Sequence, residues 1–160
     1  PHQQDRILTF LNPMSDPLGS GYQVIQSMIS IGSGGFWGKG IGNGTQTDLK
    51  FLPVADSDFI ISVTAEEMGF KAIFLIIISI SFFIYWSINF ASRIENKFVS
   101  TLIIGYSTLI YAHMIINLGM ISGLMPVTGL PAPFISYGGS FFLTCSIVIG
   151  LINNAINNNL

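Results

Sequence analysis

Charged residues are scarce in this chain and absent from its C-terminal part. Asp, Glu, Lys and Arg make up 9% of the 160 residues, whereas a soluble domain carries about 25%. None of the four occurs between Phe98 and Leu160. This shortage of charge argues against an ordinary soluble domain and indicates that the C-terminal part lies in a lipid bilayer.

Cysteine is almost absent as well. Cys145 is the single cysteine and stands in apolar sequence, so a disulfide within the chain is excluded. A net charge of −2 argues against nucleic acid as a partner, since such binding needs a basic surface. The chain also lacks an initiator Met and a signal-peptide pattern at Pro1. We therefore expect a piece of a larger membrane protein.

Long uncharged segments take the place of the missing charge. Residues 72–92 contain no charged side chain, and a helix of this length, about 30 Å, crosses a bilayer. Because only helices or closed barrels can span lipid, we predict an all-α, polytopic integral membrane protein. Its predicted parts are transmembrane helices over 71–92, 98–122 and 134–153, turns over 93–97 and 123–133, and a tail over 154–160.

The N-terminal part, residues 1–70, is more polar. The stretch "YQVIQSMISI" (22–31) predicts a short amphipathic helix along the membrane surface. The first spanning helix is expected to begin near Phe59 and to enter lipid at Gly69. Two basic residues in the 93–97 turn favour a cytoplasmic position for that turn, which places residues 1–70 and 123–133 on the extracytoplasmic side.

The run "GSGGFWGKGIGNG" (32–44) resembles a phosphate-binding loop but fails the test for one. A Walker motif needs Gly five residues before the Gly-Lys pair and Ser or Thr directly after it. Those positions hold Ser33 and Gly40. The alternative is a flexible interfacial loop with Phe36 and Trp37 at headgroup level.

Four of the eight acidic residues stand directly before the first predicted span: Asp56, Asp58, Glu66 and Glu67. For Asp58 three interpretations remain open. It caps the helix, or it is a general base facing a lipid-linked substrate, or it holds a divalent cation together with Asp56. The two glutamates form a hydrated helix end, or at least one of them faces protein or a water-filled cavity.

Two polar residues of the later spans also have two interpretations each. His113 is a hydrogen-bonded packing histidine or an intramembrane functional group. Ser136, in "PFISYGGS", is expected to cap the third span, and the glycines that follow it are expected to allow close helix packing.

Three stretches in order resemble the SEDS family of bacterial shape, elongation, division and sporulation proteins. They are "RILTFLNPMSDPLGSGYQVIQSMISIGSGGFWGKGIGNGTQTDLKFLP", "DFIISVTAEEMGF" and "NLGMISGLMPVTGLPAPFISYGGS". Within the family, "GTQ" (44–46) and "MPVTGLP" (125–131) look like the rod-shape branch, RodA, rather than the division branch, FtsW.

The resemblance implies the C-terminal part of a ten-helix enzyme, a peptidoglycan glycosyltransferase that polymerises lipid II into glycan strands. It implies the bacterial cytoplasmic membrane, with its lipids, as the location and a class B penicillin-binding protein, a transpeptidase, as the partner. We expect the part to be inactive when isolated, because three helices without their neighbours leave a large surface uncovered.

The family motif "HTDF" corresponds here to "DSDF" (56–59), so the resemblance implies that Asp58 is the catalytic base. Asp56 replaces the family's His and Ser57 its Thr. The leaving diphosphate would need a divalent cation or basic side chains. For these and other substrate contacts the candidate residues are Gln26, Lys39, Asp56 and Glu66, with Arg6 as a weaker one.

Two other functions remain open at this stage. A flippase for a lipid-linked precursor would carry polar residues along its spans and helices broken near the midplane, whereas the acids here gather at one surface. A non-catalytic scaffold for the penicillin-binding protein would use Asp58 only as a helix cap.

Overall fold

The computed structural model describes residue 10, residues 20–45 and residues 57–159. These residues contain five labelled helices and no strand, which confirms the all-α prediction for the described part of the chain. The helices are α2 (Ser20–Gly34), α4 (Ile60–Met68), α5 (Phe70–Ala91), α6 (Lys97–Ile121) and α7 (Gly139–Asn159).

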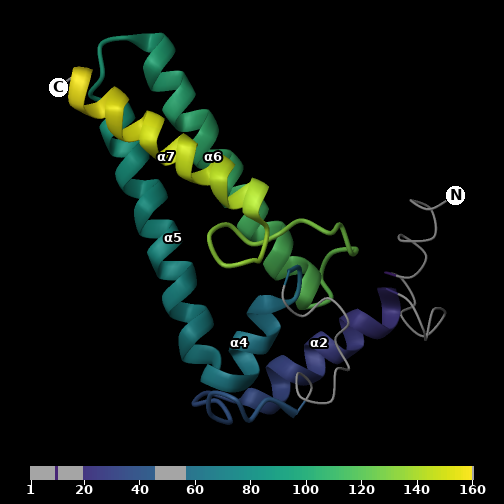
Figure 1. The fold of residues 1–160 in the computed structure, drawn as a ribbon. Helices are drawn as coiled ribbons and strands as arrows, with labels where there is room; N and C mark the ends of the chain where they lie inside the picture. The colour runs from purple at the N-terminus through teal and green to yellow at the C-terminus, as the bar shows by residue number, and fades with distance from the viewer. Residues whose placement is uncertain (1–9, 11–19, 46–56, 160) are drawn as a thin grey trace, which may run out of the picture.

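Helices α5 and α6 form a long antiparallel hairpin (Figure 1). Both are long and apolar enough to cross a membrane, and their bounds lie within one residue of the predicted spans. At the tip of the hairpin the Asn96 side chain caps α6 by accepting from the amides of Phe98 and Val99 at 3.1 and 3.4 Å. Ser100 Oγ closes the turn by donating to Ala91 O at 2.7 Å.

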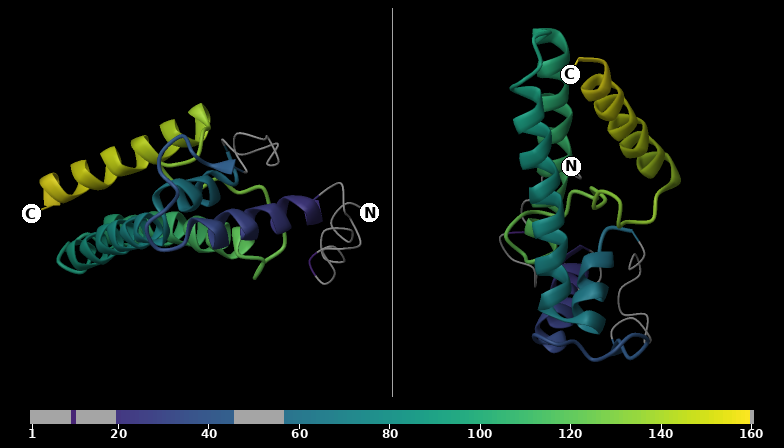
Figure 2. Two further views of the ribbon diagram at one scale, coloured as in Figure 1. Left: turned by 90° about the horizontal axis from the view of Figure 1, so that it is seen from below. Right: turned by 90° about the vertical axis from the view of Figure 1, so that its left-hand side faces the viewer.

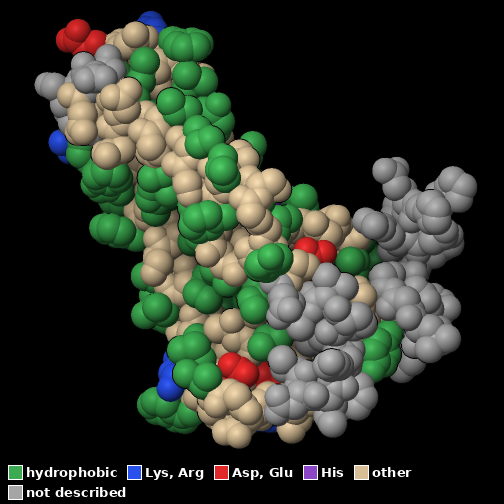
Figure 3. Space-filling model, viewed as in Figure 1, with side chains coloured by type: hydrophobic (Ala, Val, Ile, Leu, Met, Phe, Trp, Pro, Cys, Tyr) green, Lys and Arg blue, Asp and Glu red, His purple; other side chains and the backbone are tan. Residues whose placement is uncertain are grey.

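Charge is concentrated at the two ends of the hairpin. Charged side chains gather at its tip and around the end where α2 and α4 lie, with hydrophobic surface between them (Figure 3). Large apolar side chains on α5 are exposed, among them Leu75 and Phe82. This distribution suits helices that lie in lipid or against further helices.

Helix α7 lies beside the hairpin at an angle to it (Figure 2). Its bounds differ from the prediction. We predicted a span over 134–153 and a tail over 154–160, but the helix runs from Gly139 to Asn159. Phe134 has a φ of 63°, a left-handed conformation that does not continue a right-handed helix. The prediction that Ser136 caps this helix was also wrong, because its hydroxyl bonds the backbone of other segments.

Helices α2 and α4 pack across one another at the base of the hairpin (Figure 1). Helix α2 covers the predicted 22–31 segment and extends it at both ends. Ser27 Oγ is fully buried and donates to Ile121 O at the end of α6, at 2.8 Å. The core beside it combines Phe59 and Ile61 with residues of α6 such as Met120.

The glycine run is hydrogen-bonded to the break between α4 and α5, while Phe36 and Trp37 within it are exposed, as an interfacial loop requires. We expected one helix from near Phe59, but the chain breaks at Gly69, which has a φ of 81°. At this break the glycine run forms hydrogen bonds with the end of α4 and the start of α5. The backbone groups at a helix end have no partners within the helix itself. The bonds are Lys39 N to Glu66 O, Gly40 N to Glu67 O and Phe70 N to Gly35 O, each 2.9 Å.

Close approach explains why α2 ends on glycine. A Cβ atom on Gly34 would lie 2.1 Å from Ala65 O of α4, whereas a Cβ on Gly32 would meet nothing within 4 Å. We expect Gly34→Ala to lower the free energy of unfolding by about 1–3 kcal/mol, because α2 and α4 must separate. The measurement is the thermal unfolding of the full-length protein in detergent.

The matched control is Gly32→Ala, two residues earlier on the same helix. This change is expected to raise stability by about 0.5–1 kcal/mol, because alanine loses less entropy than glycine in a helix. Equal melting temperatures for the two variants would contradict the observed contact between α2 and α4.

Candidate functional site

Asp58 lies in the turn before α4, where α4, the end of α6 and the 123–138 loop meet. Its backbone is tied to both of the other segments. The carbonyl oxygen of Asp58 accepts a hydrogen bond from Asn117 Nδ2 of α6 at 3.0 Å. The preceding carbonyl, that of Ser57, accepts from Ser136 Oγ at 2.6 Å.

The same two side chains hold the loop. Asn117 Nδ2 also donates to Leu130 O at 2.8 Å, and Ser136 Oγ accepts from Ala132 N at 2.7 Å. Both side chains are buried, Asn117 completely. Each therefore joins the Asp58 turn to the loop, and the two segments are fixed relative to one another.

The carboxylate of Asp58 lies over the backbone of Gly129. A Cβ atom on Gly129 would be 3.5 Å from Asp58 Oδ2, and Gly129 has a φ of 71°. A side chain here would strain the backbone, since this φ favours glycine. The "MPVTGLP" stretch thus forms one wall beside the carboxylate.

The helix-cap interpretation of Asp58 was wrong. The N-cap residue of α4 is Phe59, one position later. None of the hydrogen bonds among the described residues joins the Asp58 carboxylate to an amide of α4. The position of Asp58 is set through its backbone.

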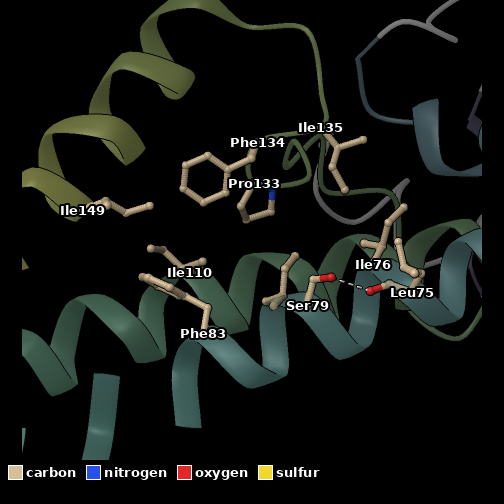
Figure 4. A pocket seen from close by; sticks show the side chains of 10 residues that line it. Leu75, Ile76, Ser79, Phe83, Ile110, Pro133, Phe134, Ile135 and Ile149 are labelled. Carbon is tan, nitrogen blue, oxygen red and sulfur yellow. Dashed lines mark hydrogen bonds between the residues drawn. The ribbon is translucent and has the colours of Figure 1, made fainter. Parts of the chain in front are cut away.

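Two cavities meet beside this site. One, of about 570 Å³, is lined by Ile60 and by residues 135–139 and Phe142. The other, of about 330 Å³, is lined almost wholly by apolar side chains of α5, α6, α7 and Pro133–Ile135 (Figure 4). Ile135 borders both. Both linings are mostly apolar, and Asp58 belongs to neither of them.

Comparison with known proteins identifies the relatives of this chain. Residues 1–159 match the cell cycle protein family of FtsW, RodA and SpoVE. The chain belongs to this family, the SEDS family. Its curated relatives include the peptidoglycan glycosyltransferase MrdB of Escherichia coli K12, 40% identical over 94% of this chain and 41% of the relative.

Other SEDS relatives are similar to the same degree. The peptidoglycan glycosyltransferase RodA of Treponema pallidum is 38% identical over 95% of this chain and 35% of its own length. A probable peptidoglycan glycosyltransferase FtsW of Trichlorobacter lovleyi is 40% identical over 93% of this chain and 39% of its own length. The chain thus spans about two fifths of these relatives, and its assignment to the RodA branch stays a prediction.

A solved SEDS-like structure has the same fold. A chain of a peptidoglycan synthase complex superimposes with a TM-score of 0.73 and 30% identity, over 99% of this chain and 43% of that one. The described structure of that complex concerns the coordination of polymerisation and crosslinking.

Lys39 and Glu66, both predicted substrate contacts, bind one another in this SEDS chain. Lys39 Nζ lies 2.6 Å from Glu66 Oε1, and the Glu66 side chain is fully buried. Thr45 Oγ1 donates to the same oxygen at 2.9 Å and accepts from Lys39 Nζ at 2.8 Å. The ion pair locks the glycine run to α4, and Glu66 faces protein rather than a hydrated helix end.

Gln26 and His113 are the remaining predicted residues that the structure describes. Gln26 is half-buried on α2, while Asp56 and Arg6 fall outside the described residues. His113 stacks on Phe141 with ring centroids 5.1 Å apart, but its buried Nδ1 has no hydrogen bond among the described residues, so the predicted hydrogen-bonded packing is not observed there. No group of three His, Cys, Asp or Glu able to hold a metal occurs within residues 20–45 and 57–159.

Asn117 was missed as a site residue. An amide within an apolar helix needs partners for its two N–H groups, and that requirement was the available signal. The identity of the partners, Asp58 and Leu130, depends on tertiary structure.

The buried ion pair predicts that loss of Lys39 and loss of Glu66 have unequal effects on stability. We expect Lys39→Met to lower the free energy of unfolding by about 3–5 kcal/mol, because the Glu66 carboxylate loses its ion pair while it stays buried. Glu66→Gln should cost less, since Lys39 is 27% exposed and retains water. Thermal unfolding of the full-length protein measures both.

Lys71→Met is the control for loss of a nearby lysine. Lys71 Nζ lies 4.8 Å above the ring of Trp37, an exposed contact worth about 0.5–1 kcal/mol. If Glu66→Gln were as destabilising as Lys39→Met, the explanation by a buried charge would fail.

Proposed function

We propose that this chain is the C-terminal part of a peptidoglycan glycosyltransferase that polymerises lipid II for rod-shaped growth, with Asp58 as its general base. The observation that carries the proposal is the position of the Asp58 carboxylate. It lies over Gly129, on a turn whose backbone is held by Asn117 and Ser136. The names of the SEDS relatives support the reaction class.

The cavities suit the hydrocarbon part of a lipid-linked substrate, because both are lined mostly by apolar side chains. Lipid II has a hydrocarbon tail and a sugar head, joined by a diphosphate. The cavity between α5, α6 and α7 would take part of the tail. Ile60, two residues after Asp58, lines the larger cavity, so the sugar would lie on that side.

The proposed reaction is a single inverting displacement. The 4-hydroxyl oxygen of the incoming lipid II sugar attacks the anomeric carbon at the end of the growing chain. As that C–O bond forms, the bond to the lipid diphosphate breaks and its electron pair leaves with the diphosphate. Asp58 accepts the hydroxyl proton. Attack from the opposite face turns an α-linked donor into a β-linked product.

The leaving diphosphate needs positive charge nearby. A divalent cation, part of our sequence-based expectation, would provide it, but no step here is assigned to one. Lys39 is already paired with Glu66 at 2.6 Å. The proposal therefore favours basic groups outside the described residues over Lys39, with Arg6 as one candidate.

The proposal includes location and partner. The two apolar helices would lie in the bacterial cytoplasmic membrane, with residues 1–70 outside the cytoplasm. A class B penicillin-binding protein would crosslink the strands, and the similarity to a chain of a peptidoglycan synthase complex supports this partner. The flippase alternative is less well supported, because the break at Gly69 precedes α5, a helix of 22 residues, instead of interrupting it.

Asp58→Asn in the full-length protein with its transpeptidase partner tests the function. The substitution keeps the shape of the side chain and removes the base. Glycan-strand synthesis from purified lipid II should fall by about 10²–10⁴-fold, the usual contribution of a general base. Protein level and partner binding should not change.

Glu67→Gln is the matched control. Glu67 lies on α4, outside the Asp58 cavities, and its carboxylate accepts from Gly42 N at 3.2 Å, a bond that glutamine retains. This variant should polymerise at the wild-type rate. Strand synthesis by Asp58→Asn at the wild-type rate would refute Asp58 as the general base, whereas no strand synthesis by the wild-type protein would refute the polymerase assignment and leave the flippase or scaffold.

A further inference from the structure

The side chain of Asn117 uses both of its N–H groups on the site. Nδ2 donates to Asp58 O at 3.0 Å and to Leu130 O at 2.8 Å. The residue is fully buried near the end of α6. Because an amide nitrogen carries two hydrogens, neither is left for another acceptor.

The two bonds end on either side of the carboxylate. One holds the backbone of Asp58 itself. The other holds Leu130, the residue after Gly129, whose backbone lies beneath Asp58 Oδ2. A single side chain therefore fixes both the acid and the wall that it faces. Ser136 provides a second tie, but to Ser57 and Ala132 rather than to these two residues.

The orientation of the amide is determined by its acceptors. With the group reversed, Oδ1 would point at two carbonyl oxygens, and no hydrogen bond could form. In the observed orientation Oδ1 is buried and has no hydrogen bond to any of the described residues. Asn117 thus donates two hydrogen bonds to the Asp58 site, although its own Oδ1, a buried acceptor, has none among the described residues. The two donated bonds therefore decide the position of this side chain.

We propose that Asn117 is a positioning residue for Asp58: its amide sets the separation between the carboxylate and the Gly129 wall, where the acceptor hydroxyl enters. This inference rests on the proposed function. Asn117 touches neither substrate nor reacting atom, so it acts only through the place of Asp58. Its loss should lower kcat and leave KM for lipid II nearly unchanged.

The first test is Asn117→Ala in the full-length protein with its partner. We expect kcat for strand synthesis to fall by about 10–100-fold, the effect of a small misplacement of a reacting group. Ser107→Ala is the control. Ser107 is fully buried on the same helix, and its hydroxyl has no hydrogen bond among the described residues, so this variant should keep the wild-type rate.

The second test, Asn117→Asp, covers the case in which the alanine variant does not fold. Burial and two facing carbonyl oxygens favour the neutral form of the introduced carboxyl. In that form the acid donates one hydrogen bond to the site. The anion donates none and repels both carbonyls. The rate relative to wild type should therefore be highest at low pH and fall as the pH rises.

Wild-type kcat in Asn117→Ala, or a rate ratio for Asn117→Asp that does not vary with pH, would overturn the inference. A rise in KM with kcat unchanged would also overturn it, since that result indicates ordinary substrate binding. The Asp58→Asn and wild-type results distinguish failure of the positioning role of Asn117 from failure of the proposed function. If that variant is inactive while Asn117→Ala is fully active, the positioning role fails and the polymerase assignment stands. If Asp58→Asn is active, Asp58 is not the base; if the wild type makes no strands, the function itself fails.

Discussion

Hydrogen bonds to two adjacent backbone carbonyls, those of Ser57 and Asp58, are the constraint on which the rest of the site depends. Their donors come from the end of α6 and from the loop before α7. The Asp58 turn is far in the sequence from both donors, and no regular ladder joins it to them. Because buried polar side chains must find partners, the amide and hydroxyl of these donors specify one arrangement of the segments.

Helix α4 is fixed at its other end by a different device. Backbone amides of the glycine run satisfy its last carbonyls, and the buried Lys39–Glu66 pair ties the same run to its side chains. Only glycine permits the approach at Gly34 and Gly38, where a Cβ would lie 2.1 and 2.2 Å from carbonyl oxygens of α4. A nine-residue helix has little stability of its own, so these contacts, with the bonds at Asp58, explain how it holds a defined position.

The sequence predicted what depends on local pattern. The bounds of α5 and α6 were within one residue because charged or polar residues enclose long apolar runs. The start of α7 was placed five residues early, since apolar composition does not reveal the left-handed φ of Phe134. Asp58 was found through a motif resemblance. The pairing of Lys39 with Glu66 and the role of Asn117 depend on which segments meet in space, and no local pattern encodes that.

The way Asp58 is held fits the work of a base. Hydrogen bonds donated to a carboxylate favour its charged form and make it a weaker proton acceptor. The bonds from Asn117 and Ser136 end on main-chain carbonyl oxygens instead. These bonds immobilise the backbone of Asp58 and take no lone pair from its carboxylate. A glycine wall serves the same end, because Gly129 brings no side chain between the acid and an entering hydroxyl.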